Sequence, residues 1–264
     1  MKKLNVVLRT CDKVSLTSDR IVPKDQCVLR CLKSLVTSLR ISQCDYKLII
    51  IDDRSSSQTL DMIKTLAPEA ILIQMPERDD SDLNAKQKSR FSVEMAYNYI
   101  DSLPVDELVY IIEDDYLHYS DSIKKMSEAY DYFTAFTGKQ IGIFPQDFTQ
   151  LYPHPENKFN ETYVEPCYVL PGPDRYYRTT WFTHESFLIP LSVINKYRNY
   201  FRRLLDIGSN DHDWEGSTIS NVWCSDDVLM LMPIMKTLAI HVGEKKDIPF
   251  FNNDFQTLWD QNQY

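Results

Sequence analysis

The sequence predicts an α/β protein whose doubly wound, mostly parallel sheet is flanked by helices, and two observations support this fold class. Short apolar runs rich in β-branched residues alternate with longer segments whose apolar residues recur at helical spacing. Such strand-then-helix units follow one another, which is typical of a parallel sheet with helical crossovers. We expect one domain, with a first half over residues 1–118, a second half over 119–243 and a C-terminal tail over 244–264.

Four units of this kind are expected in the first half of the chain and just beyond it. The expected strands cover residues 4–8, 47–51, 70–74 and 108–112, and the helices that follow them cover 26–40, a segment ending near 66, 85–100 and 120–136. Because the carboxyl ends of parallel strands meet at one edge of a sheet, the residues that follow each strand are expected close together.

The remainder of the chain has a less regular pattern. After an expected strand over 141–144, residues 146–178 are rich in proline and aromatic residues and have no helical period, which predicts an irregular insertion. Extended structure is then expected over 176–189, a helix over 191–205, a polar loop over 206–222, a helix over 225–236 and a short strand over 237–242.

Composition excludes several classes of protein. The formal net charge of -9 argues against a nucleic-acid-binding surface, which is normally basic. No run approaches the ~20 apolar residues that span a bilayer, so we expect no transmembrane segment and a soluble, cytoplasmic protein, with peripheral membrane association left open. The six cysteines form no CxxC pair, which fits reduced thiols. With only six glycines the chain also lacks a Walker A motif and a GxGxxG motif, which disfavours an ATPase or a dinucleotide-dependent oxidoreductase.

Carboxylates follow two of the expected strands. Glu113, Asp114 and Asp115 come directly after the strand over 108–112, and Asp52 and Asp53 follow the strand over 47–51. Since unpaired carboxylates are costly to bury, both strands must reach the surface at these acids, along one edge of the sheet. Clustered carboxylates suit a hard divalent cation that keeps positions open for phosphate oxygens. A solvated acidic loop that caps the next helix is the alternative for the three later acids.

Five segments, taken in order, resemble the GT-A-fold glycosyltransferases of family 2, which use nucleotide-sugar donors. The segments are Asn5–Thr10, Ile49–Asp53, Ile111–Asp115, Cys224–Asp227 and His241–Gly243. The resemblance covers residues 1–115 and only isolated points beyond them. It implies a GT-A-like domain with the irregular insertion on the acceptor side. The implied reaction moves a sugar from a nucleotide sugar, with a UDP-sugar as the first choice, to a hydroxyl of a glycan or other glycoconjugate acceptor, with inversion.

The resemblance also implies roles for individual acids. Asp115 would be the direct ligand of Mn²⁺ or Mg²⁺, with Glu113 in the same motif and Asp114 nearer the donor ribose, and His241 would be a late metal ligand. Asp52 and Asp53 would accept hydrogen bonds from the base or the ribose, since an ionised carboxylate only accepts. A helix N-cap is the alternative role for Asp53, and a structural role is the alternative for His241.

Further donor contacts and a general base complete the predicted site. Arg9, Thr10, Lys86 and Arg90 are candidates for donor contacts, although a solvated helix face also explains the last two. Asp227, backed by Asp226, is the expected general base; its alternative is an N-cap of the helix expected at Val228. A retaining glycosyltransferase, a metal-dependent phosphohydrolase and a non-catalytic carbohydrate-binding protein remain the alternative functions.

Overall fold

The fold is built on one sheet of nine strands in the order β3-β2-β1-β4-β9-β6-β10-β8-β7. The computed structural model describes residues 2–13, 22–83, 85–147, 167–181, 183, 186–206, 220–242 and 254–264. The predicted α/β class, with a mostly parallel sheet flanked by helices, is confirmed by this topology.

The four predicted strand-then-helix units are present and form the parallel half of the sheet. The strands are β1 (Leu4–Thr10), β2 (Tyr46–Asp52), β3 (Ile71–Gln74) and β4 (Leu108–Glu113), and the helices are α1 (Lys24–Ser42), α2 (Ser57–Leu66), α3 (Ala85–Ile100) and α4 (Ser122–Thr137). Strand β1 lies between β2 and β4 and is parallel to both. Its residues are buried throughout, which explains why apolar periodicity identified it.

The other half of the sheet mixes strand directions. Its strands are β6 (Gln140–Ile143), β7 (Val169–Pro171), β8 (Tyr176–Thr179), β9 (Phe187–Pro190) and β10 (Val228–Pro233). Strand β9 lies antiparallel between β4 and β6, so β6 runs in the direction of β4. Strand β10 is parallel to β6 and antiparallel to β8. The amino ends of β6 and β10 therefore lie at the sheet edge opposite the carboxyl end of β4.

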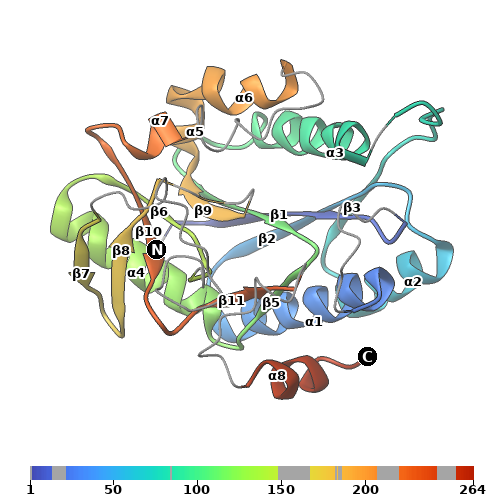
Figure 1. The fold of residues 1–264 in the computed structure, drawn as a ribbon, viewed down its shortest axis with the longest axis horizontal. Coiled ribbons are helices and arrows are strands. Elements are labelled where there is room, and N and C mark those ends of the chain that lie inside the picture. Colours follow the sequence, from blue (N-terminus) through green and yellow to red (C-terminus); the bar gives the residue numbers. More distant parts are fainter. Residues whose placement is uncertain are drawn as a thin grey trace, which may run out of the picture.

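Helices cover both faces of the sheet, as Figure 1 shows. Helices α1, α2 and α4 pack on one face, and α3 packs on the other together with α5 (Leu191–Lys196) and α6 (Arg198–Asp206). None of the helices in the described ranges combines the length and the apolar character needed to cross a membrane.

A second, smaller group of elements lies beside α1. Strands β5 (Tyr116–His118) and β11 (Ala239–His241) form an antiparallel pair, and α8 (Phe255–Gln261) packs beside α1 (Figure 1). This group has a separate apolar cluster, made of Cys27, Cys31, Leu117, Ile240, Val242, Leu258 and Trp259. The short strand expected over 237–242 is confirmed, whereas β5 and α8 were not expected.

The sequence-based prediction is wrong at two places in the second half. The helix expected over 225–236 is strand β10, because a short apolar run does not distinguish a buried strand from a buried helix. The helix expected over 191–205 is interrupted at Tyr197, between α5 and α6. Most of the expected loop over 206–222 and of the irregular insertion lies outside the described residues; α7 (Ser220–Trp223) falls within the former.

Candidate functional site

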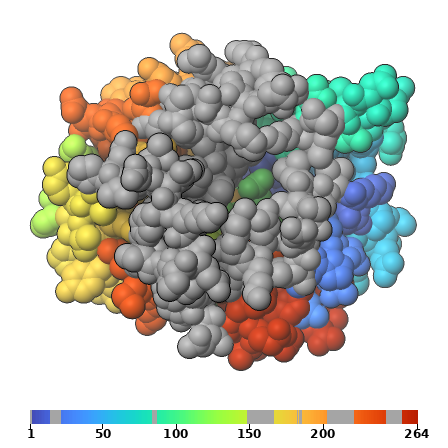
Figure 2. All heavy atoms as spheres, viewed as in Figure 1, coloured from blue at the N-terminus to red at the C-terminus, as the bar shows by residue number. Residues whose placement is uncertain are grey.

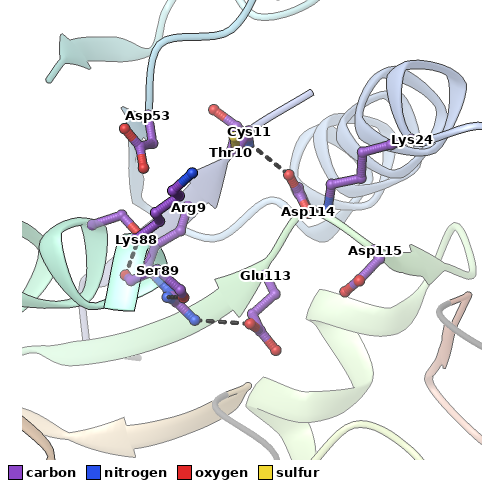
Figure 3. A pocket seen from close by; sticks show the side chains of 11 residues that line it. Arg9, Thr10, Cys11, Lys24, Asp53, Lys88, Ser89, Glu113, Asp114 and Asp115 are labelled. Atoms are coloured by element: carbon purple, nitrogen blue, oxygen red, sulfur yellow. Dashed lines mark hydrogen bonds and ion pairs between the residues drawn. The ribbon is translucent and has the colours of Figure 1, made fainter. Parts of the chain in front are cut away.

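A pocket with an empty volume of about 550 Å³ lies where the predicted acids leave the sheet. Its walls come from the carboxyl ends of β1, β2 and β4, from the first residue of α1 and from α3 (Figure 3). Figure 2 shows a small green surface, from the segment around β4 and β5, at the centre of this face of the molecule. We call this cavity the carboxyl-edge pocket.

The first acid after β4 is paired with an arginine from the neighbouring strand. Arg9 and Glu113 are register partners in the parallel pair of β1 and β4. Arg9 Nη2 donates to Glu113 Oε1 at 2.9 Å, and Arg9 Nη1 donates to Ser89 Oγ on α3 at 3.4 Å. Arg9 is only 6% exposed, so its charge requires such a partner. This pair fixes Glu113 within the protein.

The second acid is held from two sides. Lys24 Nζ, at the start of α1, donates to Asp114 Oδ1, and the backbone N–H of Cys11 donates to Asp114 Oδ2 at 2.8 Å. Both carboxylate oxygens of Asp114 therefore have partners inside the chain. The alternative of a merely solvated acidic loop does not describe Glu113 and Asp114, which are both tied to cations.

The third acid, Asp115, lies beside the histidine that was predicted to bind metal with it. The pairing of β5 with β11 places His241 opposite Tyr116, and the backbone N–H of Val242 donates to the Asp115 carbonyl at 2.7 Å. His241 Nε2 lies 3.4 Å from Asp115 Oδ1. The two residues are 126 positions apart in sequence, and the structure brings them together; their role as metal ligands stays a prediction. Within the described ranges, no group of three or more His, Cys, Asp or Glu side chains is arranged to hold a metal ion.

The two acids after β2 have different environments. Asp52 is fully buried and accepts from Thr10 Oγ1 at 2.9 Å and from the Ser55 N–H at 2.9 Å. Burial raises the pKa of Asp52, although both hydrogen bonds oppose the shift. The hydrogen bond between Thr10 and Asp52 thus links the ends of β1 and β2.

Asp53, by contrast, lines the carboxyl-edge pocket and is clamped by arginines. Arg78 donates Nη1 and Nη2 to the two Asp53 oxygens at 2.8 and 2.7 Å, and Arg54 Nε donates to Oδ1 at 3.1 Å. Its predicted alternative, a helix N-cap, is wrong, because Ser56 caps α2. Arg78 was not among the predicted residues, since nothing in the sequence marks a partner 25 positions away.

Helix α3 contributes a different basic residue from those predicted. Lys88, Ser89 and Ser92 line the pocket, whereas Arg90 is half-buried and does not. The side chain of Lys86 lies outside the described part of the chain. Residues two positions apart on a helix are separated by about 200° around its axis, so Lys88 and Arg90 lie on nearly opposite faces.

The predicted general base lies at the other edge of the sheet. Asp227 immediately precedes β10, and its carbonyl accepts from the N–H of Gln140, the first residue of β6. Lys196 Nζ and the Tyr197 hydroxyl each donate to its carboxylate at 2.5 Å and lower the pKa of Asp227 to about 2. Asp226 beside it is exposed. Because residues 228–233 form a strand and not a helix, neither acid reaches the pocket, and the structure corrects the assignment of both as the base.

Comparisons with known proteins give structural similarity only. The sequence matches no protein-family model and no curated protein. Staphylococcus aureus TarS 1-349 is 8% identical at a TM-score of 0.49, with 88% of this chain and 60% of that chain covered. Galactosyltransferase LgtC in complex with donor and acceptor sugar analogues is 10% identical. Its TM-score is 0.44, and 86% of this chain and 72% of that chain are covered. UTP-bound UGPase from Acinetobacter baumannii is 9% identical. Its TM-score is 0.47, and 99% of this chain and 92% of that chain are covered. The chain thus spans less than two thirds of the TarS fragment.

Proposed function

We propose that this protein transfers a sugar from a nucleotide-sugar donor, with UDP-sugars as the first candidates, to a hydroxyl of a glycan or other glycoconjugate. The observation that carries the proposal is the carboxyl-edge pocket, where β2 and β4 end in acids that lie beside cations, one of which is Arg9 of β1. Open α/β sheets bind ligands outside the carboxyl ends of their strands.

The donor chemistry of Asp115 and His241 fits a divalent cation such as Mn²⁺ or Mg²⁺. Asp115 Oδ1 and His241 Nε2 lie 3.4 Å apart, and these two side chains would hold the ion. Glu113 and Asp114 are less suited, because Arg9 and Lys24 already hold them. When bound, the ion would stabilise the departing nucleoside diphosphate as its charge develops.

Asp53 is the residue that we propose for contact with the nucleoside. An ionised carboxylate offers about four acceptor sites, and the two arginines use three of them. The remaining site can accept from a ribose hydroxyl or a base N–H. Asp52, which is fully buried and accepts from Thr10 and Ser55, supports the turn instead.

The prediction of an inverting transfer no longer has a candidate base to support it. An inverting transfer needs a base near the acceptor hydroxyl on the face of the sugar opposite the diphosphate. Since Asp226 and Asp227 lie at the other sheet edge, inversion stands here only as part of the family resemblance.

Calorimetric titration of UDP with and without Mn²⁺ tests the proposal. We expect Mn²⁺ to tighten UDP binding to the wild type, and Asp115→Asn to abolish this dependence while the protein stays folded. Asp226→Asn is the matched control, because it removes the same charge from an exposed acid away from the pocket. A folded Asp115→Asn variant that keeps Mn²⁺-dependent UDP binding would overturn the metal assignment. Release of UDP from a UDP-sugar without any acceptor would favour a phosphohydrolase instead.

A further inference from the structure

The three cations that line the carboxyl-edge pocket differ in how their charges are compensated. Arg9 forms an ion pair with Glu113, and Lys24 forms one with Asp114. Within the described part of the chain, the Lys88 ammonium has no hydrogen bond and no ion pair, although it lines the same pocket. Lys88 is therefore the pocket cation whose charge remains available to a ligand.

The backbone around Lys88 is anchored by the network that holds the rest of the pocket. Arg78 Nη2 donates to the Lys88 carbonyl at 3.3 Å, and the same guanidinium clamps Asp53. The next residue, Ser89, accepts from Arg9 at 3.4 Å. Figure 3 shows Lys88 and Ser89 reaching from α3 toward Arg9, with Glu113, Asp114 and Asp115 on the other side of the pocket. The helix thus presents Lys88 from a fixed position.

The charge balance indicates what kind of group Lys88 binds. Glu113 and Asp114 are paired with Arg9 and Lys24, Asp53 is paired with arginines, and Asp115 lies beside His241 at the pocket wall. An anionic ligand group that enters this pocket is attracted by the charge of Lys88. A lysine binds phosphate as a point charge, so it does not need the planar geometry that an arginine requires.

We propose that Lys88 contacts a phosphate oxygen of the ligand and makes the pocket select nucleoside diphosphates over nucleosides. This inference rests on the proposed function, and it assigns to Lys88 the discrimination between UDP and uridine. It assigns the phosphate contact on α3 to Lys88 and not to Arg90, one of the two candidates named from sequence.

The test compares the affinities of UDP, uridine and inorganic pyrophosphate for four proteins by calorimetry at one salt concentration. The proteins are the wild type, Lys88→Met, Lys88→Arg and Arg90→Met. Lys88→Met removes the charge but keeps an unbranched side chain, and Arg90→Met makes the same change on the opposite face of α3. We expect Lys88→Met to weaken UDP binding about tenfold to a hundredfold, which is the usual contribution of a hydrogen bond to a charged group. Uridine affinity stays unchanged, Lys88→Arg restores most of the loss, and Arg90→Met binds UDP like the wild type.

The possible outcomes separate this inference from the proposed function. If the wild type binds UDP and Lys88→Met binds it equally well, the inference is overturned while the proposed function stands. A Lys88→Met variant that loses UDP and uridine affinity to the same extent also overturns it, because the side chain would then support the pocket and not the phosphate. If the wild type binds pyrophosphate but not UDP, and Lys88→Met loses pyrophosphate, Lys88 is an anion site and the proposed donor is wrong. A wild type that binds none of the three contradicts both.

Discussion

Neighbouring residues of one acidic run meet different partners in this protein. Glu113 pairs with Arg9, Asp114 with Lys24 and the Cys11 N–H, and Asp115 lies beside His241. Residue type alone does not distinguish the three acids as metal ligands, and only the family resemblance singled out Asp115. The structure distinguishes them, because two are already neutralised by cations of the chain and the third lies beside an imidazole.

Arg78 is expected to be a positioning residue for Asp53. Arg78→Lys removes the planar fork that donates to both carboxylate oxygens and leaves a buried carboxylate partly unsatisfied. We expect the free energy of unfolding in urea to fall by about 1–3 kcal/mol. Arg40→Lys is the control, since Arg40 makes a similar two-bond contact with Glu69 but is 51% exposed. That change should cost less than about 1 kcal/mol. Equal costs for the two variants would contradict the role given to Arg78.

His118 provides a prediction about pH. Its imidazole is buried and bonded to the Tyr110 hydroxyl, with 2.9 Å between Nε2 and the oxygen, and burial lowers the pKa of His118 to about 3. Between about pH 6.5 and 3 the unfolded chain therefore binds one more proton at this residue than the folded chain does. The contribution of His118 to the free energy of unfolding is therefore fully present above pH ~6.5, and it is lost as the pH falls through this window. NMR of the folded protein should find the His118 ring neutral at about pH 5. A titration midpoint near 6.5 would contradict the burial of this imidazole.

At the scale of elements, α8 and the pair of β5 and β11 support one side of the site. Arg30 of α1 donates to the Trp259 carbonyl at 2.8 Å and lies 4.5 Å from the centroid of the Trp259 ring. Trp259 also belongs to the apolar cluster that contains Leu117 and Ile240. Those two residues lie in the strands that carry His241 and follow Asp115, so α8 packs behind the predicted metal ligands.

Truncation of Trp259 tests whether α8 is an integral part of the fold. Trp259 is 6% exposed, so Trp259→Ala should lower the free energy of unfolding by about 3–5 kcal/mol, the usual cost of removing a buried aromatic side chain. Tyr264→Ala, at a residue that is 47% exposed beyond the same helix, should change stability by less than about 0.5 kcal/mol. A Trp259→Ala variant that unfolds in urea like the wild type would mean that α8 adds little to the folded state.

The position of β10 leads to a prediction opposite to the one drawn from sequence. Asp227→Asn should leave UDP affinity and turnover within about twofold of the wild type, because Asp227 lies at the amino edge of the sheet and bonds Lys196 and Tyr197. A general base would instead account for about 10²- to 10⁴-fold in turnover. A loss of that size in a folded variant, measured with any active donor and acceptor pair, would restore the original assignment.

The elements that could be predicted from sequence share one physical property. Strands β1, β2 and β4 are buried runs between amphipathic helices, and this burial appears directly as apolar periodicity. Strand β10 was missed because its short apolar run is compatible with either a buried strand or a buried helix. Helix α8 was missed because its buried face exists only through contact with α1 and the strand pair behind it.

The candidate site was predictable to a similar extent. Arg9, Asp53 and the acids of 113–115 were found because they follow strands, and the carboxyl ends of parallel strands converge. Arg78 and Lys88 were not found, since their positions depend on how a turn and a helix pack against those strand ends. The failed prediction of Asp227 follows from the error at β10, because a helix start and a strand start place an acid at different edges.

At the scale of the whole molecule, one edge of the sheet carries the proposed chemistry. The parallel strands β1, β2 and β4 end there, Lys24 begins α1 there, and the pair of β5 and β11 adds His241 from the far end of the described second half. The central claim is that this edge binds a nucleotide sugar together with a divalent cation.

A thermal-shift panel of UDP-, GDP- and dTDP-sugars, each with and without Mn²⁺, tests that claim most directly. A ligand present at a hundred times its dissociation constant stabilises the folded state by about 2.7 kcal/mol. We expect a UDP-sugar to raise the melting temperature in the presence of Mn²⁺, and the rise to disappear in Asp115→Asn but not in Asp226→Asn. If no nucleotide sugar shifts the melting temperature of the folded wild type at millimolar concentration, with or without the ion, the carboxyl-edge pocket is not a donor site.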